Sequence, residues 1–355
     1  MHKRSTPALA AFAVVAFALA GCATASSPEA APSSAPAASG APSDDACPMP
    51  ESMATATVAT NPGAQDLVIK HVKEGGFDTK YNLDLQVQEF QNPPATAQAI
   101  VQKAVNLGFG GLTTMVQARD TGADVIFVGA LSTPGNGMFV KEDSPYQSIG
   151  DLKGKKVGSF TALNGAITSI MQAYAQESED FNLLEDTDGE VVVAPDAALI
   201  GLLDQGQLEA VILGVDATAV QQFEGTYRQI VDLRTDFPDT FDFQALYLGP
   251  VTTEEYAEAH CGEVRAYASA IRDAVLDIQE NEEIWETYVE AIGQPQDAAE
   301  TFQELYSESW VTEWSEEEVD GMKQLVTTLT PYLDPAFPKE VDPALFSLDY
   351  PVFEE

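Results

Sequence analysis

Among the residues that could do chemistry, histidine and cysteine are scarce: the chain has three of each in 355 residues. His71 and His260 lie in separate segments with no partner at metal-ligand spacing, so we expect no metal site. His260 and Cys261 are adjacent, and adjacent side chains on a helix point apart, which argues against a nucleophile with its base. The sequence therefore predicts a protein without catalytic residues and without a cofactor.

A glycine- and lysine-containing segment, 150–156, has some likeness to a phosphate-binding loop. However, Gly150 and Gly154 are four residues apart instead of five. Lys156 also stands where a Ser or Thr would bind magnesium. We interpret the segment as a loop that leads into a strand.

The charge balance excludes other functions. The chain has 56 Asp and Glu against 17 Lys and Arg, a net charge of -39. Binding to nucleic acid or to an anionic membrane surface needs clustered basic residues, which are not found here. The apolar fraction of 45% is ordinary for a globular protein, and the length suits two lobes with cores of their own.

The N-terminus has the features of a targeting signal. Lys3 and Arg4 precede an uncharged apolar run, 8–20, of about 13 residues, too short for a spanning helix of about 20. The run ends in Leu-Ala-Gly-Cys at 19–22, which resembles the lipobox of bacterial lipoproteins, where the cysteine is lipidated and becomes the mature N-terminus. We expect residues 1–22 to be a lipoprotein signal peptide with Cys22 as the lipidated residue; an ordinary secretory peptide is the alternative.

The segment after this cysteine is predicted to be a disordered spacer, 23–50, because it is almost entirely Ala, Ser and Pro. A lipid, a spacer and a folded body together indicate a tether to the outer face of a membrane. Two cysteines remain, Cys47 and Cys261, and outside the cytoplasm an even pair favours a disulfide. The sequence does not show whether the two approach each other, so the pairing stays open.

The body alternates strands with helices, which predicts an α/β fold with mainly parallel sheets. In the first half we expect strands at 54–60, 83–90, 106–109 and 124–129, with helical patterns over 64–72 and 97–104. A second, smaller unit has strands at 156–158, 191–193, 210–213 and 229–231, and Asp196 is the expected N-cap of one of its helices. Beyond Thr252 the pattern is helical, and Trp285, Trp310 and Trp314 in this tail are expected to pack in the core.

Three segments carry a resemblance to a known family: 149–158, 106–111 and 207–212. They are similar to the sulfonate/taurine/nitrate and thiamine-pyrimidine group of ABC-transporter binding proteins, over roughly residues 54–233. Glu209 departs from the aspartate usual in the third segment. The resemblance implies the two-lobe type II architecture of periplasmic binding proteins, with a first lobe at 51–138, a second at 139–243, and a return to the first lobe with a helical tail at 244–355. The crossings between lobes are expected near 138–141 and 244–249.

The resemblance also places the ligand in the cleft between the lobes, at loops that follow strands and precede helices. Free N–H groups and the helix dipole at such positions favour small anions. The candidate ligand-binding residues are Asn61, Gly111, Thr113, Thr114, Ser132, Phe160, Thr161, Asn164, Gly165 and Asp216. The alternative is that they are turn and capping residues, and Asp216 in particular is expected to be an N-cap. Because these loops hold no Lys or Arg, while Phe109, Phe160 and Asp216 suit an aromatic or amine-bearing molecule, the sequence leaves the ligand open.

The function implied is that of a monomeric, lipid-anchored receptor that captures a small solute and delivers it to an ABC permease. A ligand-sensing lipoprotein without a permease is a second hypothesis. An enzyme that makes a thiamine pyrimidine is a third, but its cysteine-rich stretch is missing and a secreted location does not suit it.

Overall fold

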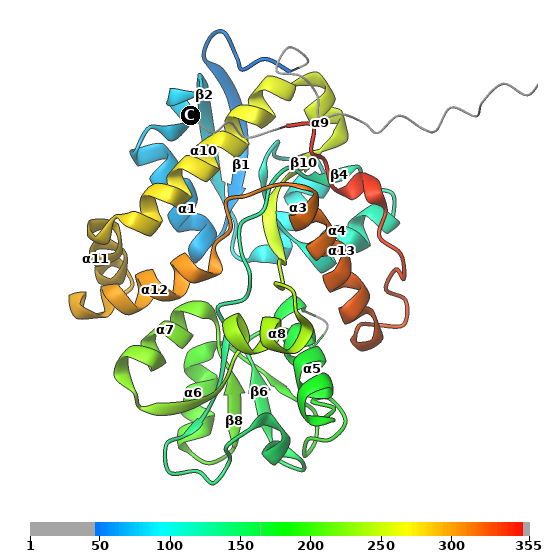
Figure 1. Ribbon diagram of the computed structural model, residues 1–355. Helices are drawn as coiled ribbons and strands as arrows, with labels where there is room; N and C mark the ends of the chain where they lie inside the picture. Colours follow the sequence, from blue (N-terminus) through cyan, green and yellow to red (C-terminus); the bar gives the residue numbers. More distant parts are fainter. Residues whose placement is uncertain (1–46, 164, 351–355) are drawn as a thin grey trace, which may run out of the picture. The chain divides into compact units, whose positions relative to one another are not determined.

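Figure 1 shows the computed structural model of the chain, which describes residues 47–163 and 165–350. The predicted signal peptide with Cys22, nearly all of the predicted spacer and the candidate site residue Asn164 lie outside the described residues. None of the helices within those two ranges combines the length and the hydrophobicity that spanning a membrane requires.

The chain up to residue 127 alternates strands and helices, as the hydrophobic pattern predicts. Its elements are β1 (Ala54–Thr60), α1 (Ala64–Glu74), α2 (Phe77–Lys80), β2 (Leu83–Glu89), α3 (Pro93–Val101), β3 (Gly108–Gly111), α4 (Leu112–Asp120) and β4 (Val125–Phe127). Val68, Ile69 and Val72 form the buried face of α1, and Gly75 follows its last residue. The sequence prediction of β1 and α1 is confirmed almost to the residue.

The middle of the chain forms a second α/β unit. Its elements are β5 (Gly137–Lys141), η1 (Ile149–Leu152), β6 (Val157–Ser159), α5 (Ala166–Glu179), β7 (Val192–Val193), α6 (Asp196–Asp204), β8 (Ala210–Ile212), α7 (Val215–Glu224), β9 (Tyr227–Asp232) and α8 (Leu233–Phe241). The segment 150–156 lies in η1 and the turn before β6, as a loop leading into a strand.

The last part of the chain returns through one strand and is then helical. Its elements are β10 (Leu248–Thr253), α9 (Glu254–Ala259), α10 (Cys261–Glu280), α11 (Glu282–Ala291), η2 (Gln296–Ala298), α12 (Ala299–Ser309), α13 (Glu316–Leu329), η3 (Thr330–Tyr332) and η4 (Pro343–Leu345). Ser315 and Glu318 form a capping box at the start of α13, so the acidic run 316–318 is a helix start, where negative charge suits the dipole.

The strands make two groups, which define the lobes. In the first lobe β1 and β2 pair in parallel, a bridge from Val58 to Leu107 joins β1 to the segment before β3, and β10 lies antiparallel between β3 and β4. In the second lobe the order is β7-β6-β8-β5-β9, with β6 parallel to β7 and β8, and β5 antiparallel to β8 and β9. The sheets are therefore mixed and not mainly parallel as predicted, because β5 and β10, which link the lobes, run against their neighbours.

The two lobes are joined by the segments 128–136 and 242–247, which lie between strands of different sheets. The first predicted crossing, near 138–141, is wrong, because those residues already pair within the second sheet as β5. The second joining segment overlaps the predicted crossing at 244–249. Apolar patterning marks a strand but does not say which sheet it joins, which explains the error.

The tail helices complete the core of the first lobe. Helix α10 packs against α1 (Figure 1), with Tyr267 and Ile271 among its buried residues. Trp285 is fully buried and stacks on Tyr306, with ring centroids 5.3 Å apart. Trp310 is also buried, so the expected core packing of these two tryptophans is confirmed, while Trp314 is half-buried.

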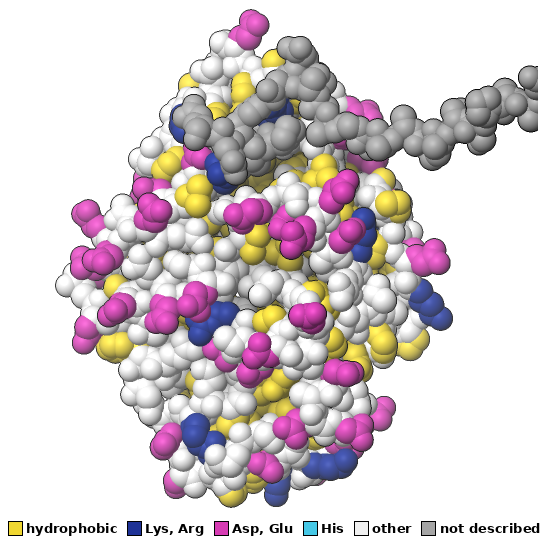
Figure 2. All heavy atoms as spheres, viewed as in Figure 1, with side chains coloured by type: hydrophobic (Ala, Val, Ile, Leu, Met, Phe, Trp, Pro, Cys, Tyr) yellow, Lys and Arg dark blue, Asp and Glu magenta, His cyan; other side chains and the backbone are white. Residues whose placement is uncertain are grey.

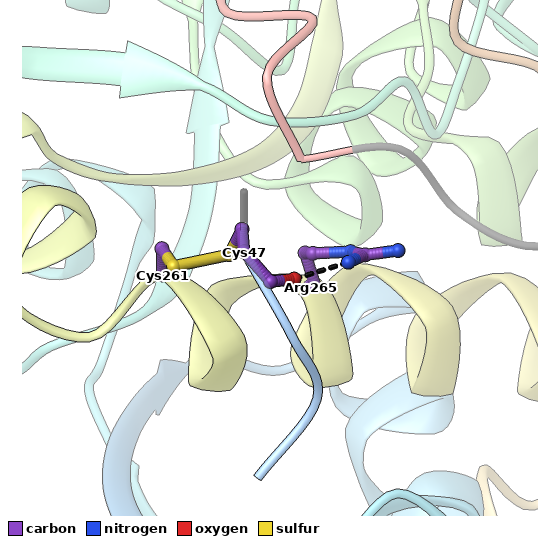
Figure 3. Close-up of a disulfide and its surroundings, with 3 residues drawn as sticks. All are labelled: Cys47, Cys261 and Arg265. Carbon is purple, nitrogen blue, oxygen red and sulfur yellow. Dashed lines mark hydrogen bonds between the residues drawn. A yellow bond between two sulfur atoms is a disulfide. The ribbon is translucent and has the colours of Figure 1, made fainter. Parts of the chain in front are cut away.

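A disulfide joins Cys47 to Cys261, the first residue of α10, across 214 residues of sequence, with Cα atoms 5.7 Å apart (Figure 3). One turn further along α10, the guanidinium of Arg265 donates a hydrogen bond to the backbone oxygen of Cys47. Arg265 is almost fully buried, and the backbone of Pro48 passes next to Gly262, where a β-carbon would not fit. The start of the described chain is therefore held on the first lobe by a covalent bond and a charge-assisted hydrogen bond.

Candidate functional site

A cavity of about 750 Å³ brings two of the expected loops together. The turn between β1 and α1 contributes Pro62 and Gly63, and the start of α7 in the second lobe contributes Asp216. Helices α1 and α11 form the walls, with Lys70, His71 and Tyr288 among the lining side chains. Residues from both lobes thus line one space, as the sequence predicts for a ligand site.

Asp216 is the best-defined polar group of this cavity. Its carboxylate accepts hydrogen bonds from the hydroxyl of Tyr306 at 2.5 Å and from that of Tyr288 at 3.0 and 3.1 Å. Burial raises the pKa of Asp216, and the two hydroxyls oppose that shift. The predicted capping role is wrong: Gly214 is the N-cap of α7, and the Asp216 side chain turns to the tyrosines.

Asp196 lies beside this group, and sequence reasoning assigned it a different role. It is the first residue of α6 and not its N-cap, and its Oδ1 accepts a hydrogen bond from the backbone N–H of Gly214 at 2.9 Å. Burial raises the pKa of Asp196, and the nearby charge of Asp216 acts in the same direction. A β-carbon at Gly214 would lie 2.9 Å from Asp196 and 3.5 Å from the Phe160 ring, so a glycine is needed there.

Phe160, Asp196 and Asp216 thus lie at one edge of the second sheet, after β6, β7 and β8. The signal that could have found Asp196 was available: it follows a strand of the same sheet, as Asp216 does. Of these three residues, Asp216 is the one that lines the 750 Å³ cavity, and a carboxylate there suits a ligand group that is cationic or donates hydrogen bonds.

The first-lobe candidate Asn61 makes its side-chain hydrogen bonds within the protein. Asn61 is buried, accepts a hydrogen bond from Thr96 at 3.1 Å and donates one to the oxygen of Pro62. It therefore shapes the turn at the cavity and does not present its amide to it. Gly63, which does line the cavity, has φ 111°, a conformation that favours glycine.

The other predicted residues that the structure describes are not among those that line this cavity. Gly111 is the N-cap of α4, after which Thr113 is buried and Thr114 exposed. Ser132 lies in the first joining segment, and its hydroxyl donates to the backbone oxygen of Thr133. In the second lobe Gly165 is the N-cap of α5, and the Thr161 hydroxyl is bonded to that of Thr168 at 2.7 Å.

A second cavity, of about 630 Å³, lies at the segments that join the lobes. Thr133 belongs to the first joining segment, and the second contributes Asp242, Phe243, Gln244 and Leu246. The remaining wall is mostly the N-terminal half of α13, with Glu317, Glu318 and Asp320. This cavity is strongly acidic, and sequence reasoning missed it because it arises from segments far apart in the chain.

The charges around the Asp216 cavity are also mainly acidic, since Asp66, Glu74 and Glu283 line it as well. Its Lys70 is paired with Asp66 at 2.5 Å, and His71 contacts Asp277 at 2.6 Å. Among the residues that the structure describes, no group of three or more His, Cys, Asp or Glu is arranged to hold a metal ion.

Comparison with solved structures shows the fold. The periplasmic aliphatic sulphonate binding protein of Escherichia coli is 17% identical, with a TM-score of 0.65 over 80% of this chain and 90% of that one. The alkanesulfonate-binding protein of Xanthomonas axonopodis pv. citri, solved with MOPS bound, is 16% identical, with a TM-score of 0.64 over 82% and 96%. The chain has the two-lobe periplasmic binding protein fold that the sequence predicts.

Sequence comparison adds two matches. A protein of Haemophilus influenzae, provisionally named a thiamine biosynthesis protein, is 27% identical over 127 residues, which are 35% of this chain and only 40% of that protein. The family model described as NMT1/THI5 like matches residues 71–283, more than half of the chain. The chain therefore belongs to the NMT1/THI5-like family.

Proposed function

We propose that the protein is an extracytoplasmic solute-binding lipoprotein that captures a small organic molecule between its lobes and delivers it to an ABC permease. The observation that carries the proposal is the 750 Å³ cavity, which is lined by Asp216 of the second lobe and by the β1–α1 turn of the first. Cavities of this size hold small molecules, and closure around a ligand is the usual behaviour of two lobes joined by two segments. Family and fold support the same role.

The chemistry of the site favours a ligand with an amine or a heteroaromatic ring that donates hydrogen bonds. A ligand cation near Asp216 would favour the charged carboxylate that burial disfavours. A sulfonate without an amine would meet repulsion from the same carboxylate, whereas a taurine-like molecule carries both groups. A thiamine-pyrimidine precursor is the heteroaromatic candidate, in line with the name of the Haemophilus relative.

The surface is consistent with a soluble receptor body. Figure 2 shows Asp and Glu side chains scattered over the visible face, with few Lys and Arg among them.

We propose that Cys22 carries the lipid that holds this body at the membrane. Replacing Cys22 by Ala should release the protein from the membrane fraction or leave its precursor uncut; unchanged processing and membrane association would contradict the anchor.

Binding is best tested by calorimetric titration of the full chain with an aminopyrimidine, taurine and an alkanesulfonate without an amine. An unfolding experiment gives a second measurement. A ligand that binds only the native state raises the free energy of unfolding by about 2.7 kcal/mol at a hundredfold excess over its dissociation constant. Asp216→Asn should weaken binding of an amine-bearing ligand at least about tenfold, roughly 1.4 kcal/mol. Asp151→Asn in η1, away from the cavity, is the matched control.

Two outcomes would redirect the proposal. Recovery of a chemically altered ligand after incubation with pure protein would favour the enzyme hypothesis. Binding without a permease and ATPase encoded nearby would favour a ligand sensor. No binding by any of the three probes, in a folded protein, would count against the cavity as a site for these classes.

A further inference from the structure

Asp216 is also the point where the second lobe is bonded to the tail helices. It belongs to α7, whereas its partners Tyr288 and Tyr306 belong to α11 and α12. Tyr306 is buried in the same core cluster as α1, β1 and α10 of the first lobe, and Ala219 of α7 reaches into that cluster. The carboxylate–tyrosine contact therefore connects the second lobe to a helix fixed in the first.

An ion pair repeats this connection nearby. Arg234, at the start of α8 in the second lobe, contacts Glu308 of α12 at 2.8 Å and Asp232 at 3.0 Å. Just past Glu308, the backbone oxygen of Ser309 accepts a hydrogen bond from the backbone N–H of Thr133 in the first joining segment, at 2.8 Å. Helix α12 is thus bonded to the second lobe and to one of the two segments that join the lobes.

Helix α13 also connects the two lobes, through apolar contacts. Its buried residues Met322, Leu325 and Leu329 share one core cluster with side chains of α4 in the first lobe and of α5 in the second. It packs directly against both of those helices. Separating the lobes would expose part of this apolar face to water, which is unfavourable.

We propose that the tail helices α11–α13 form a clamp that holds the two lobes together through the protein's own contacts, with Asp216 as its central polar group. The same carboxylate lines the cavity of the proposed ligand site, so the clamp and that site share one group. The clamp itself does not depend on the identity of the ligand or on delivery to a permease.

The test is the distance between the lobes in the full chain. Fluorophores on non-natural amino acids at exposed positions Gln88 in the first lobe and Gln205 in the second would report it by energy transfer. The double variant Tyr288→Phe/Tyr306→Phe removes both hydroxyls that bind Asp216. It should shift the distribution to longer distances, with at least a doubling of the open fraction before any ligand is added.

Tyr256→Phe is the matched control, because the Tyr256 hydroxyl also donates to a carboxylate, that of Glu263, but both residues belong to the first lobe. It should leave the distance distribution unchanged. Circular dichroism checks folding, and a milder pair, Arg234→Gln and Glu308→Gln, serves if the tyrosine variant unfolds. Wild-type distances in folded variants of both kinds would overturn the clamp and leave the binding proposal standing.

Discussion

In the first lobe, Asp78, Asp124 and Asp342 each accept a hydrogen bond from a Lys or Arg side chain, at 2.7, 3.0 and 2.8 Å. At the edge of the second lobe, the hydrogen-bond partners of Asp216 are tyrosine hydroxyls, and Asp196 accepts a bond from a backbone N–H. The pKa of Asp342 is lowered, chiefly by its hydrogen bond from Arg119, whereas burial raises the pKa of Asp216 and of Asp196.

This difference matters because the chain has 56 acids and 17 bases, so most carboxylates must do without a cation. Water hydrates the exposed carboxylates instead. Asp216 is partly buried, and two neutral donors only partly replace the water that it loses. The second-lobe edge is therefore the place where a ligand cation would gain most, and where the contribution of Asp216 to stability should depend on pH in the sense opposite to that of Asp342.

The largest effect is expected on the first-lobe side, from the disulfide. Cys47→Ser/Cys261→Ser opens a loop of 214 residues, and loss of a disulfide that closes a long loop costs about 4 kcal/mol. The measurement is urea unfolding with and without reductant. Reductant should weaken the wild type to the level of the variant and leave the variant unchanged; equal stability of the oxidised wild type and the variant would contradict this expectation.

The next effect concerns the buried charge of Asp78. Its carboxylate is fully buried, pairs with Lys73 and accepts a hydrogen bond from the backbone N–H of Leu85 at 3.1 Å. Asp78→Ala leaves these donors without their buried partner, which should cost about 3 kcal/mol in urea unfolding. Asp84→Ala removes the exposed partner of the same lysine and serves as the control, with a much smaller loss expected.

A smaller effect is expected at Asp216, and it should depend on pH in the sense opposite to that at Asp342. Because its pKa is raised in the folded state, it contributes stability below the unfolded value of about 4, and that contribution is lost as pH rises through the folded pKa. Asp216→Asn keeps an acceptor oxygen without the charge. The stability of the variant relative to the wild type should therefore rise between pH 4 and pH 7. Unfolding curves at both pH values check this, and a difference that does not change with pH would contradict it.

Structure that depends on neighbouring residues could be predicted from the sequence, whereas contacts between residues far apart in the chain could not. Alternating apolar residues and the Asn61-Pro62-Gly63 turn fixed β1 and the start of α1. The partners of Asp216 are 72 and 90 residues away, on helices whose sequence shows only an apolar face and acidic ends. With such partners unknown, an Asp near a helix start looks like an N-cap, which is why Asp196 and Asp216 were both misassigned.

The smallest effect is expected at Asp342, and its sign separates the two regions. Asp342 accepts a hydrogen bond from Arg119 at 2.8 Å, and its side chain is 47% exposed, so solvent screens most of the interaction. Asp342→Asn should therefore cost only about 0.5 kcal/mol near pH 6, and less in 1 M salt.

The lowered pKa of Asp342 means that this contribution exists above the unfolded value of about 4 and is lost as pH falls through the folded pKa. The wild type and the variant should thus converge between pH 6 and pH 2.5, measured by urea unfolding, whereas Asp216→Asn and the wild type should diverge as pH rises from 4. If both variants followed the same trend with pH, the contrast between cation-paired and hydroxyl-bound carboxylates would not hold.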